Sequence, residues 1–123
     1  MSETLITGPS RGRLFKIFTD FGPYFRQLKS DENKFFFDCL EICIDVKTEP
    51  EKRVFLGWSM VITRSGNQFT YQRFNGLFDL NADWVDAEID NQQMRLIDLS
   101  FNAFIKKLIS MLDAETGCKL TPL

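Results

Sequence analysis

The sequence of 123 residues contains no histidine. Without an imidazole, the chain cannot form Ser-His-Asp or Cys-His nucleophile pairs, histidine general bases or histidine-containing metal sites. It also lacks a phosphate-binding P-loop, a Gly-x-Gly-x-x-Gly fingerprint, zinc or calcium ligand spacings and a Gly-x-Ser-x-Gly elbow. Carboxylate pairs stay open as acid–base candidates, although Asp38 and Glu41 would alternate to opposite faces of a strand. The sequence thus indicates no metal site or cofactor, and any acid–base chemistry would have to fall on carboxylates, Lys or Tyr.

An excess of positive charge is missing as well. Lys plus Arg number 15 and Asp plus Glu number 17, for a net charge of −2. Because nucleic-acid-binding faces need clustered basic charge, we interpret Arg11, Arg13 and Lys16 as a solvated helix face. No stretch approaches the roughly 18 apolar residues of a membrane span, and Met1 to Ser10 has no apolar run for a secretion signal. These absences predict a cytoplasmic protein without direct contact to nucleic acid or membrane.

The three cysteines, Cys39, Cys43 and Cys118, form no CxxC pair, and an odd number suits a reducing compartment. In a regular strand Cys39 and Cys43 would share one face about 13 Å apart, which is too far for a disulfide. We expect small buried hydrophobes, with a reactive role for either residue left open.

Phenylalanine is abundant, supplying 13 of the 17 aromatic residues. Because its ring has no polar group, most of these side chains are expected in the core. Any phenylalanine outside the core becomes a candidate for a partner surface.

The order of expected elements predicts one α+β domain over residues 1–123, with 1–9 flexible. Ser10 should cap a helix from Arg11 to about Phe21, which ends at Gly22-Pro23. A long amphipathic helix should run from Asp90 to about Asp113 and pack within the domain, with a short coiled-coil seam as the alternative. Gly117 should cap this helix, leaving Lys119 to Leu123 as a tail.

Between the helices, the pattern predicts an antiparallel four-stranded sheet. The expected strands are Phe35–Val46, Val54–Arg64, Gln68–Phe74 and a fourth beginning within Gly76–Leu80, with a loop at Lys47–Lys52 and a hairpin turn at Ser65–Asn67. In the first strand, regular alternation puts Phe35, Phe37, Cys39 and Cys43 on one face and Phe36, Leu40, Ile42, Ile44 and Val46 on the other. Asp38 interrupts an apolar face and is a candidate buried carboxylate or capping residue.

One segment, Pro50 to Trp58, runs from a charged loop into a strand with two large aromatic residues. Phe55 and Trp58 have opposite parity, so each face receives one ring unless a bulge at Gly57 redirects them. Both rings could belong to the core. Alternatively, Arg53 could form a two-pronged pair with a partner carboxylate at a rim of Phe55, Trp58 and Tyr24.

The sequence resembles the Crl family of bacterial proteins that bind the stationary-phase sigma factor, sigma S. The shared motifs are Gly22-Pro23-Tyr24, Asn33, Phe35-Phe36-Phe37-Asp38-Cys39-Leu40, Cys43, Val46-Lys47, Pro50-Glu51, Arg53, Phe55-Leu56-Gly57-Trp58, Met60, Phe69-Thr70-Tyr71, Gly76-Leu77-Phe78-Asp79 and Asp83-Trp84. The resemblance covers residues 11–85 well and the last helix by pattern. Some members carry further tryptophans where this chain has Leu56 and Ser59.

The resemblance implies a transcriptional activator without enzymatic activity or DNA-sequence recognition. Such a protein binds domain 2 of sigma S, promotes its assembly with core RNA polymerase, touches the polymerase clamp and raises transcription of genes such as those for curli. The implied sigma-binding residues are Tyr24, Arg53, Phe55 and Trp58, with Arg53 pairing an acidic Asp-Pro-Glu stretch of sigma S. Asp38, Pro50 and Trp84 are implied as partner-binding or supporting residues. We expect a monomer, and the alternative function is a small-ligand-binding module that uses the aromatic cleft.

Overall fold

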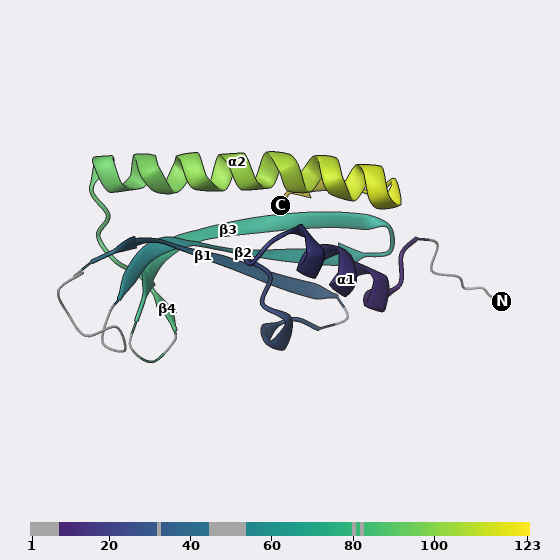
Figure 1. The fold of residues 1–123 in the computed structure, drawn as a ribbon, viewed down its shortest axis with the longest axis horizontal. Coiled ribbons are helices and arrows are strands. Elements are labelled where there is room, and N and C mark those ends of the chain that lie inside the picture. The colour runs from purple at the N-terminus through teal and green to yellow at the C-terminus, as the bar shows by residue number, and fades with distance from the viewer. Residues whose placement is uncertain (1–7, 32, 45–53, 80, 82) are drawn as a thin grey trace.

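The computed structural model describes residues 8–31, 33–44, 54–79, 81 and 83–123. Its elements in chain order are α1 (Arg11–Phe21), the 3-10 turn η1 (Gln27–Lys29), β1 (Lys34–Cys43), β2 (Phe55–Ser65), β3 (Gln68–Phe78), β4 (Trp84–Val85), α2 (Asn91–Thr116) and β5 (Lys119–Pro122). Figure 1 shows α2 lying along the sheet and α1 beside β1. The expected α+β fold, with an antiparallel sheet and a helix near each end of the chain, is confirmed.

Local capping chemistry sets the helix ends, with the predicted caps at Ser10 and Gly117 and an additional capping box at Asp90. The Ser10 hydroxyl accepts a hydrogen bond from the Arg13 N–H at 3.1 Å. Asp90 and Gln93 form a reciprocal capping box at the start of α2, which satisfies two otherwise free backbone N–H groups. Gly117 ends α2 in the left-handed region at φ 72°, where glycine carries no steric penalty. Gly22 also follows its helix, but its φ of 166° is ordinary extended backbone.

The middle strands form an antiparallel meander in the order β1-β2-β3-β4. The expected fourth strand near Gly76 is wrong, because β3 continues unbroken through this glycine, which pairs with Gly57. A Cβ at Gly76 would collide with the Val85 carbonyl, so the glycine permits the close approach of β4. The expected C-terminal tail is also wrong, since it forms β5, a parallel neighbour of β3.

A β-bulge in β1 corrects the predicted side-chain faces. The register with β2 shifts between Leu40 and Ile42, which leaves Glu41 as the extra residue. Beyond this point the alternation reverses, so Ile42 joins Cys39 on the face toward the core and Cys43 pairs with Phe55. Cys39 and Cys43 therefore do not share a face.

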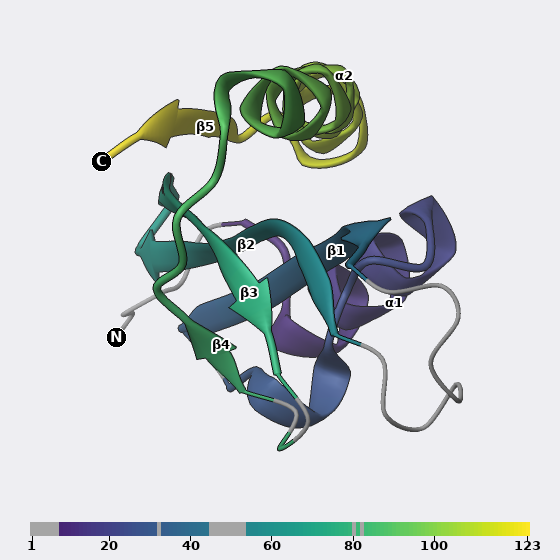
Figure 2. The ribbon, with the colours of Figure 1, turned by 90° about the vertical axis from the view of Figure 1, so that its left-hand side faces the viewer.

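The core lies between the helices and one face of the sheet, here called the inner face. Figure 2 shows α2 on this side and β4 on the opposite side, the outer face. The buried stripe of α2 confirms that the helix packs within the domain. The core side chains are Leu14, Phe15, Phe18, Phe35, Phe37, Cys39, Leu56, Trp58, Met60, Ile62, Phe69, Ile97, Phe101, Phe104, Ile105, Leu108, Leu112, Cys118 and Leu120. Among the described residues, neither helix is long and apolar enough to cross a membrane.

Candidate functional site

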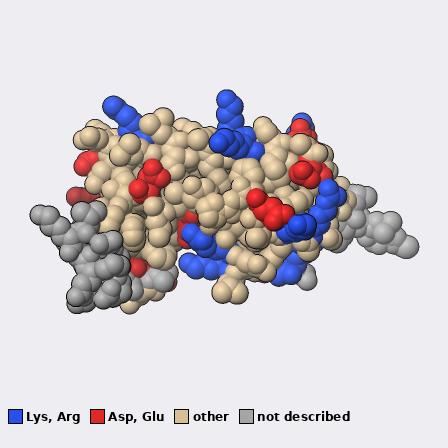
Figure 3. All heavy atoms as spheres, viewed as in Figure 1, with Lys and Arg blue, Asp and Glu red and all other residues tan. Residues whose placement is uncertain are grey.

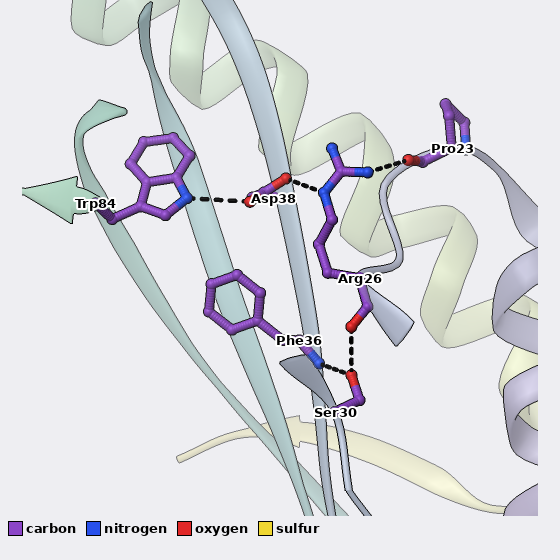
Figure 4. A network of polar contacts seen from close by, with 6 residues as sticks. All are labelled: Pro23, Arg26, Ser30, Phe36, Asp38 and Trp84. Atoms are coloured by element: carbon purple, nitrogen blue, oxygen red, sulfur yellow. Dashed lines mark hydrogen bonds and ion pairs between the residues drawn. The ribbon is translucent and has the colours of Figure 1, made fainter. Parts of the chain in front are cut away.

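A buried carboxylate organises the outer face of the sheet. Asp38 is only 2% exposed, as the break in the apolar pattern suggested. One of its oxygens accepts a hydrogen bond from Arg26 Nε at 2.5 Å and the other from Trp84 Nε1 at 3.1 Å (Figure 4). Both oxygens therefore have donors, which compensates for the cost of burying the charge. Asp38 thereby joins β1, β4 and the segment after α1.

Arg26 is the residue of this site that the sequence did not reveal. Its Nη1 donates to the Pro23 carbonyl at 2.9 Å, while Nε holds Asp38. Its own carbonyl accepts from the Ser30 hydroxyl, which in turn accepts from the Phe36 N–H, each at 2.9 Å (Figure 4). A buried aspartate signals that some cation lies nearby, but its position in the sequence does not show which one.

Tyr24 is held at the same junction by its backbone. Its carbonyl accepts from the Asp38 N–H at 3.0 Å, and the Arg26 N–H donates to the Phe36 carbonyl at 2.8 Å. These bonds attach residues 24–26 along the edge of β1. The half-buried Tyr24 ring packs against Phe104, with ring centroids 5.4 Å apart. The neighbouring Cys39, together with burial and Glu41, raises the pKa of Tyr24, so its phenol stays neutral at physiological pH.

Cys39 lies close to Tyr24 on the inner side of the sheet. Its thiol is buried, and this burial raises its pKa above the ordinary value. Because the thiolate is the reactive form, the thiol is poorly reactive at neutral pH. The structure thus favours the interpretation of Cys39 as a small buried hydrophobe.

Trp58 and Phe55 lie on opposite faces of β2, as their parity predicted. Trp58 is 0% exposed, donates from Nε1 to the Ser100 hydroxyl at 3.1 Å and packs on Phe104, with ring centroids 4.9 Å apart. Phe55 is half-buried on the outer face. The ladder of β2 with β3 is regular through Gly57, while the bulge lies across from it in β1. The buried Trp58 ring also contacts the half-buried Tyr24 ring, with centroids 5.9 Å apart.

The outer face carries a row of aromatic side chains that ends at β4. Phe55 pairs with Phe78 across the strands, and the Phe78 and Trp84 rings lie 5.6 Å apart in an edge-to-face arrangement. Leu40 and Phe74 are exposed apolar side chains on this face, and exposed Val85 of β4 lies beside it. Apolar side chains exposed to solvent in this way are typical of a protein-binding site.

Arg53 and Pro50 lie outside the described residues. The ends of their segment meet, because the Ile44 N–H donates to the Val54 carbonyl at 3.0 Å. Arg53 is the residue directly before Val54 in the sequence.

The described surface is mixed in charge. In the view of Figure 3, Lys and Arg side chains alternate with Asp and Glu, and no continuous basic patch is seen on the coloured residues. Lys16 pairs with Asp20 at 2.9 Å, in agreement with a solvated face for the first helix.

Comparison with known proteins gives the same family as the sequence motifs. The family model described as sigma factor-binding transcriptional regulator Crl matches residues 1–123. A sigma factor-binding protein Crl of Vibrio vulnificus is 34% identical over 113 residues, which cover 92% of this chain and 87% of the relative. The protein of that name from Photobacterium profundum is 33% identical over 112 residues, covering 91% and 83%. These matches confirm the expected resemblance.

Proposed function

The chain belongs to the Crl family of sigma factor-binding transcriptional regulators, and from this premise we propose that it binds domain 2 of sigma S. The complex then assembles more readily with core RNA polymerase, and transcription of sigma S-dependent genes, such as those for curli, rises. The protein acts as a cytoplasmic monomer, with a weak second contact on the polymerase clamp. It recognises no DNA sequence and catalyses no reaction.

The observation that carries this proposal is the aromatic row Phe55–Phe78–Trp84 on the outer face, beside the Asp38 network. Aromatic and arginine side chains dominate the energetics of protein interfaces. Arg53 is two residues before Phe55 in the chain, so an arginine is available at the start of this row. The sequence therefore supplies an arginine two residues before an aromatic side chain of this row.

The residues have different roles in this proposal. Arg53 forms a bidentate pair with an acidic residue of sigma S, and Phe55 shields the pair from water. Pro50 limits the conformations of the segment that carries Arg53. Asp38 and Trp84 hold the site together, and Trp58 supports the half-buried Tyr24 from the core.

The proposed mechanism is stabilisation of one sigma conformation. A partner that binds only the competent conformation raises the apparent affinity of sigma for polymerase by the inverse of that conformation's population. A tenfold gain corresponds to about 1.4 kcal/mol. A single desolvated arginine–carboxylate pair with an apolar rim is large enough to supply it.

Calorimetric titration of the protein into purified sigma S tests the proposal, with the housekeeping sigma factor as the control. Saturable heat with sigma S, together with more holoenzyme formed from limiting sigma S and core polymerase, is the expected result. Absence of binding to sigma S by the folded protein would contradict it.

A further inference from the structure

A cleft of about 230 Å³ opens on the outer face between the sheet and β4. Its aromatic lining comes from Phe36, Phe74 and Trp84, and Ser59 and Asp86 also line it. The volume suits one long side chain rather than a small-molecule cofactor, since ligand pockets usually enclose at least about 300 Å³. The shape therefore fits a single anchoring residue of a protein partner.

Ser59 supplies a polar group at this cleft. The residue is only 3% exposed, yet its hydroxyl makes no hydrogen bond to any residue that the structure describes. The Ser59 oxygen is not sealed from solvent, since it is not among the fully buried polar atoms that lack a partner, so the hydroxyl is open to the cleft. A ligand atom that donates a hydrogen bond into the cleft would satisfy the free acceptor.

One acidic residue, Asp86, lines the cleft, and it belongs to an acidic stretch of the sequence. Between Arg73 and Arg95 the sequence has five acidic residues and no basic one. Asp86 lines the cleft, and the exposed carboxylates of Asp86 and Glu88 form no ion pair within the described part of the chain. Uncompensated negative charge beside aromatic walls is complementary to a cation.

The same face already binds a cation from within the chain. The Lys29 ammonium lies 5.1 Å from the centroid of the Phe36 ring and 5.8 Å from that of Phe78. Both distances are within the range of cation–π attraction. The outer-face rings are thus positioned to accept positive charge, and Phe74 and Trp84 continue this surface into the cleft.

We propose that the cleft between β4 and the sheet binds an arginine or lysine side chain of the sigma factor. The aliphatic part of that side chain lies against Phe74 and Trp84, its N–H groups reach the Ser59 hydroxyl, and its charge faces Asp86. The inference rests on the proposed function and adds a second contact of opposite polarity to that of Arg53. An interface with one cation from each partner fixes its orientation better than one pair alone.

The test is calorimetric titration into sigma S of three variants, Asp86→Asn, Phe74→Ala and the matched control Glu88→Gln. Glu88→Gln removes the same charge two residues away, outside the residues that line the cleft. Asp86→Asn and Phe74→Ala should each weaken binding about 3- to 10-fold, as is usual for truncating one good interface contact, and the control should change it less than 2-fold. All three positions are exposed, so folding should be preserved.

Double-mutant cycles identify the occupant. Each arginine and lysine of sigma S domain 2 is changed to alanine and titrated against wild type and Asp86→Asn. One sigma residue should lose its effect in the Asp86→Asn background, because the pair is already broken. Additive effects for every sigma cation would overturn the inference, as would weakening by Phe74→Ala alone, which would indicate an apolar anchor.

If wild-type protein does not bind sigma S, the proposed function fails together with this inference. If wild-type protein binds sigma S and the cleft variants bind equally well, the proposed function stands and only the cation-binding role of the cleft is overturned.

Discussion

The indole of Trp84 donates a 3.1 Å hydrogen bond to the carboxylate of Asp38, which lies 46 residues earlier in the chain. This side-chain contact connects the two-residue strand β4 to β1, although β2 and β3 lie between them in the strand order. The other Asp38 oxygen fastens the segment that carries Tyr24. The buried Asp38 thus fixes the position of Trp84 relative to Tyr24.

Replacing Asp38 by alanine should therefore destabilise the fold. The change leaves the Arg26 and Trp84 donors without their acceptor, and we expect a loss of about 2–3 kcal/mol in the free energy of unfolding. Urea denaturation measures it. Asp20→Ala is the control, because it removes only an exposed i,i+4 pair and should cost less than about 0.5 kcal/mol. Equal losses in the two variants would contradict the network.

Arg26→Lys should weaken sigma S binding more than it weakens the fold. Lysine keeps the charge, but its single ammonium cannot reproduce the fork that holds both Asp38 and the Pro23 carbonyl. Residues 23–26 should then be less well fixed, so we expect a 3-fold or greater loss of sigma affinity with a small change in thermal stability. Unchanged affinity would show that Arg26 does not position Tyr24.

Trp58→Ala should act mainly on stability. The ring is fully buried against Phe101 and Phe104, and truncating such a side chain typically costs about 3–5 kcal/mol. Leu99→Ala serves as the control, because Leu99 is 62% exposed on α2 and should change stability by less than about 0.5 kcal/mol. A normal melting temperature for Trp58→Ala would contradict the core position. A loss of sigma binding in this variant therefore reports unfolding unless the melting temperature is preserved.

A pair of glycine substitutions tests the bulge. A Cβ at Gly57 would collide with the Cys39 carbonyl, so Gly57→Ala forces the backbone to move and should cost about 1–3 kcal/mol. Gly12 has open space around it within α1, so Gly12→Ala should stabilise the protein by about 0.5–1 kcal/mol. Urea denaturation measures both changes. If the two substitutions change the free energy of unfolding in the same direction, the close approach of β1 and β2 at Gly57 is contradicted.

These residues also show what the sequence could predict. The caps Ser10 and Asp90 were predictable because each contacts a backbone group three residues away in the chain. The bulge at Glu41 was not, because it depends on how β1 pairs with Gly57 and Leu56 of a neighbouring strand. The Asp38–Arg26 pair likewise depends on how residues 24–26 lie along β1. β5 was missed because four residues with one buried side chain show too little alternation to indicate a strand.

Stability should fall in alkaline solution. The pKa values of Cys39 and Tyr24 are raised in the fold, Cys39 first by burial and Tyr24 first by its proximity to Cys39. A group with a raised folded pKa contributes stability that is complete below its unfolded pKa and is lost as the pH rises through the folded value. The free energy of unfolding should therefore decrease as the pH rises above about 8.5, the ordinary pKa of an unfolded cysteine. Cys39→Ala should flatten this decrease, and a steeper decline in the variant would contradict the assignment.

The most direct test of the central claim is the titration of Arg53→Ala into sigma S beside Lys52→Ala, which removes the preceding positive charge. We predict that Arg53→Ala abolishes or strongly weakens binding, while Lys52→Ala binds nearly as well as wild type and both variants melt at the wild-type temperature. Binding by Arg53→Ala equal to that of Lys52→Ala would contradict the account, because Arg53 would then not be the residue that pairs with sigma S.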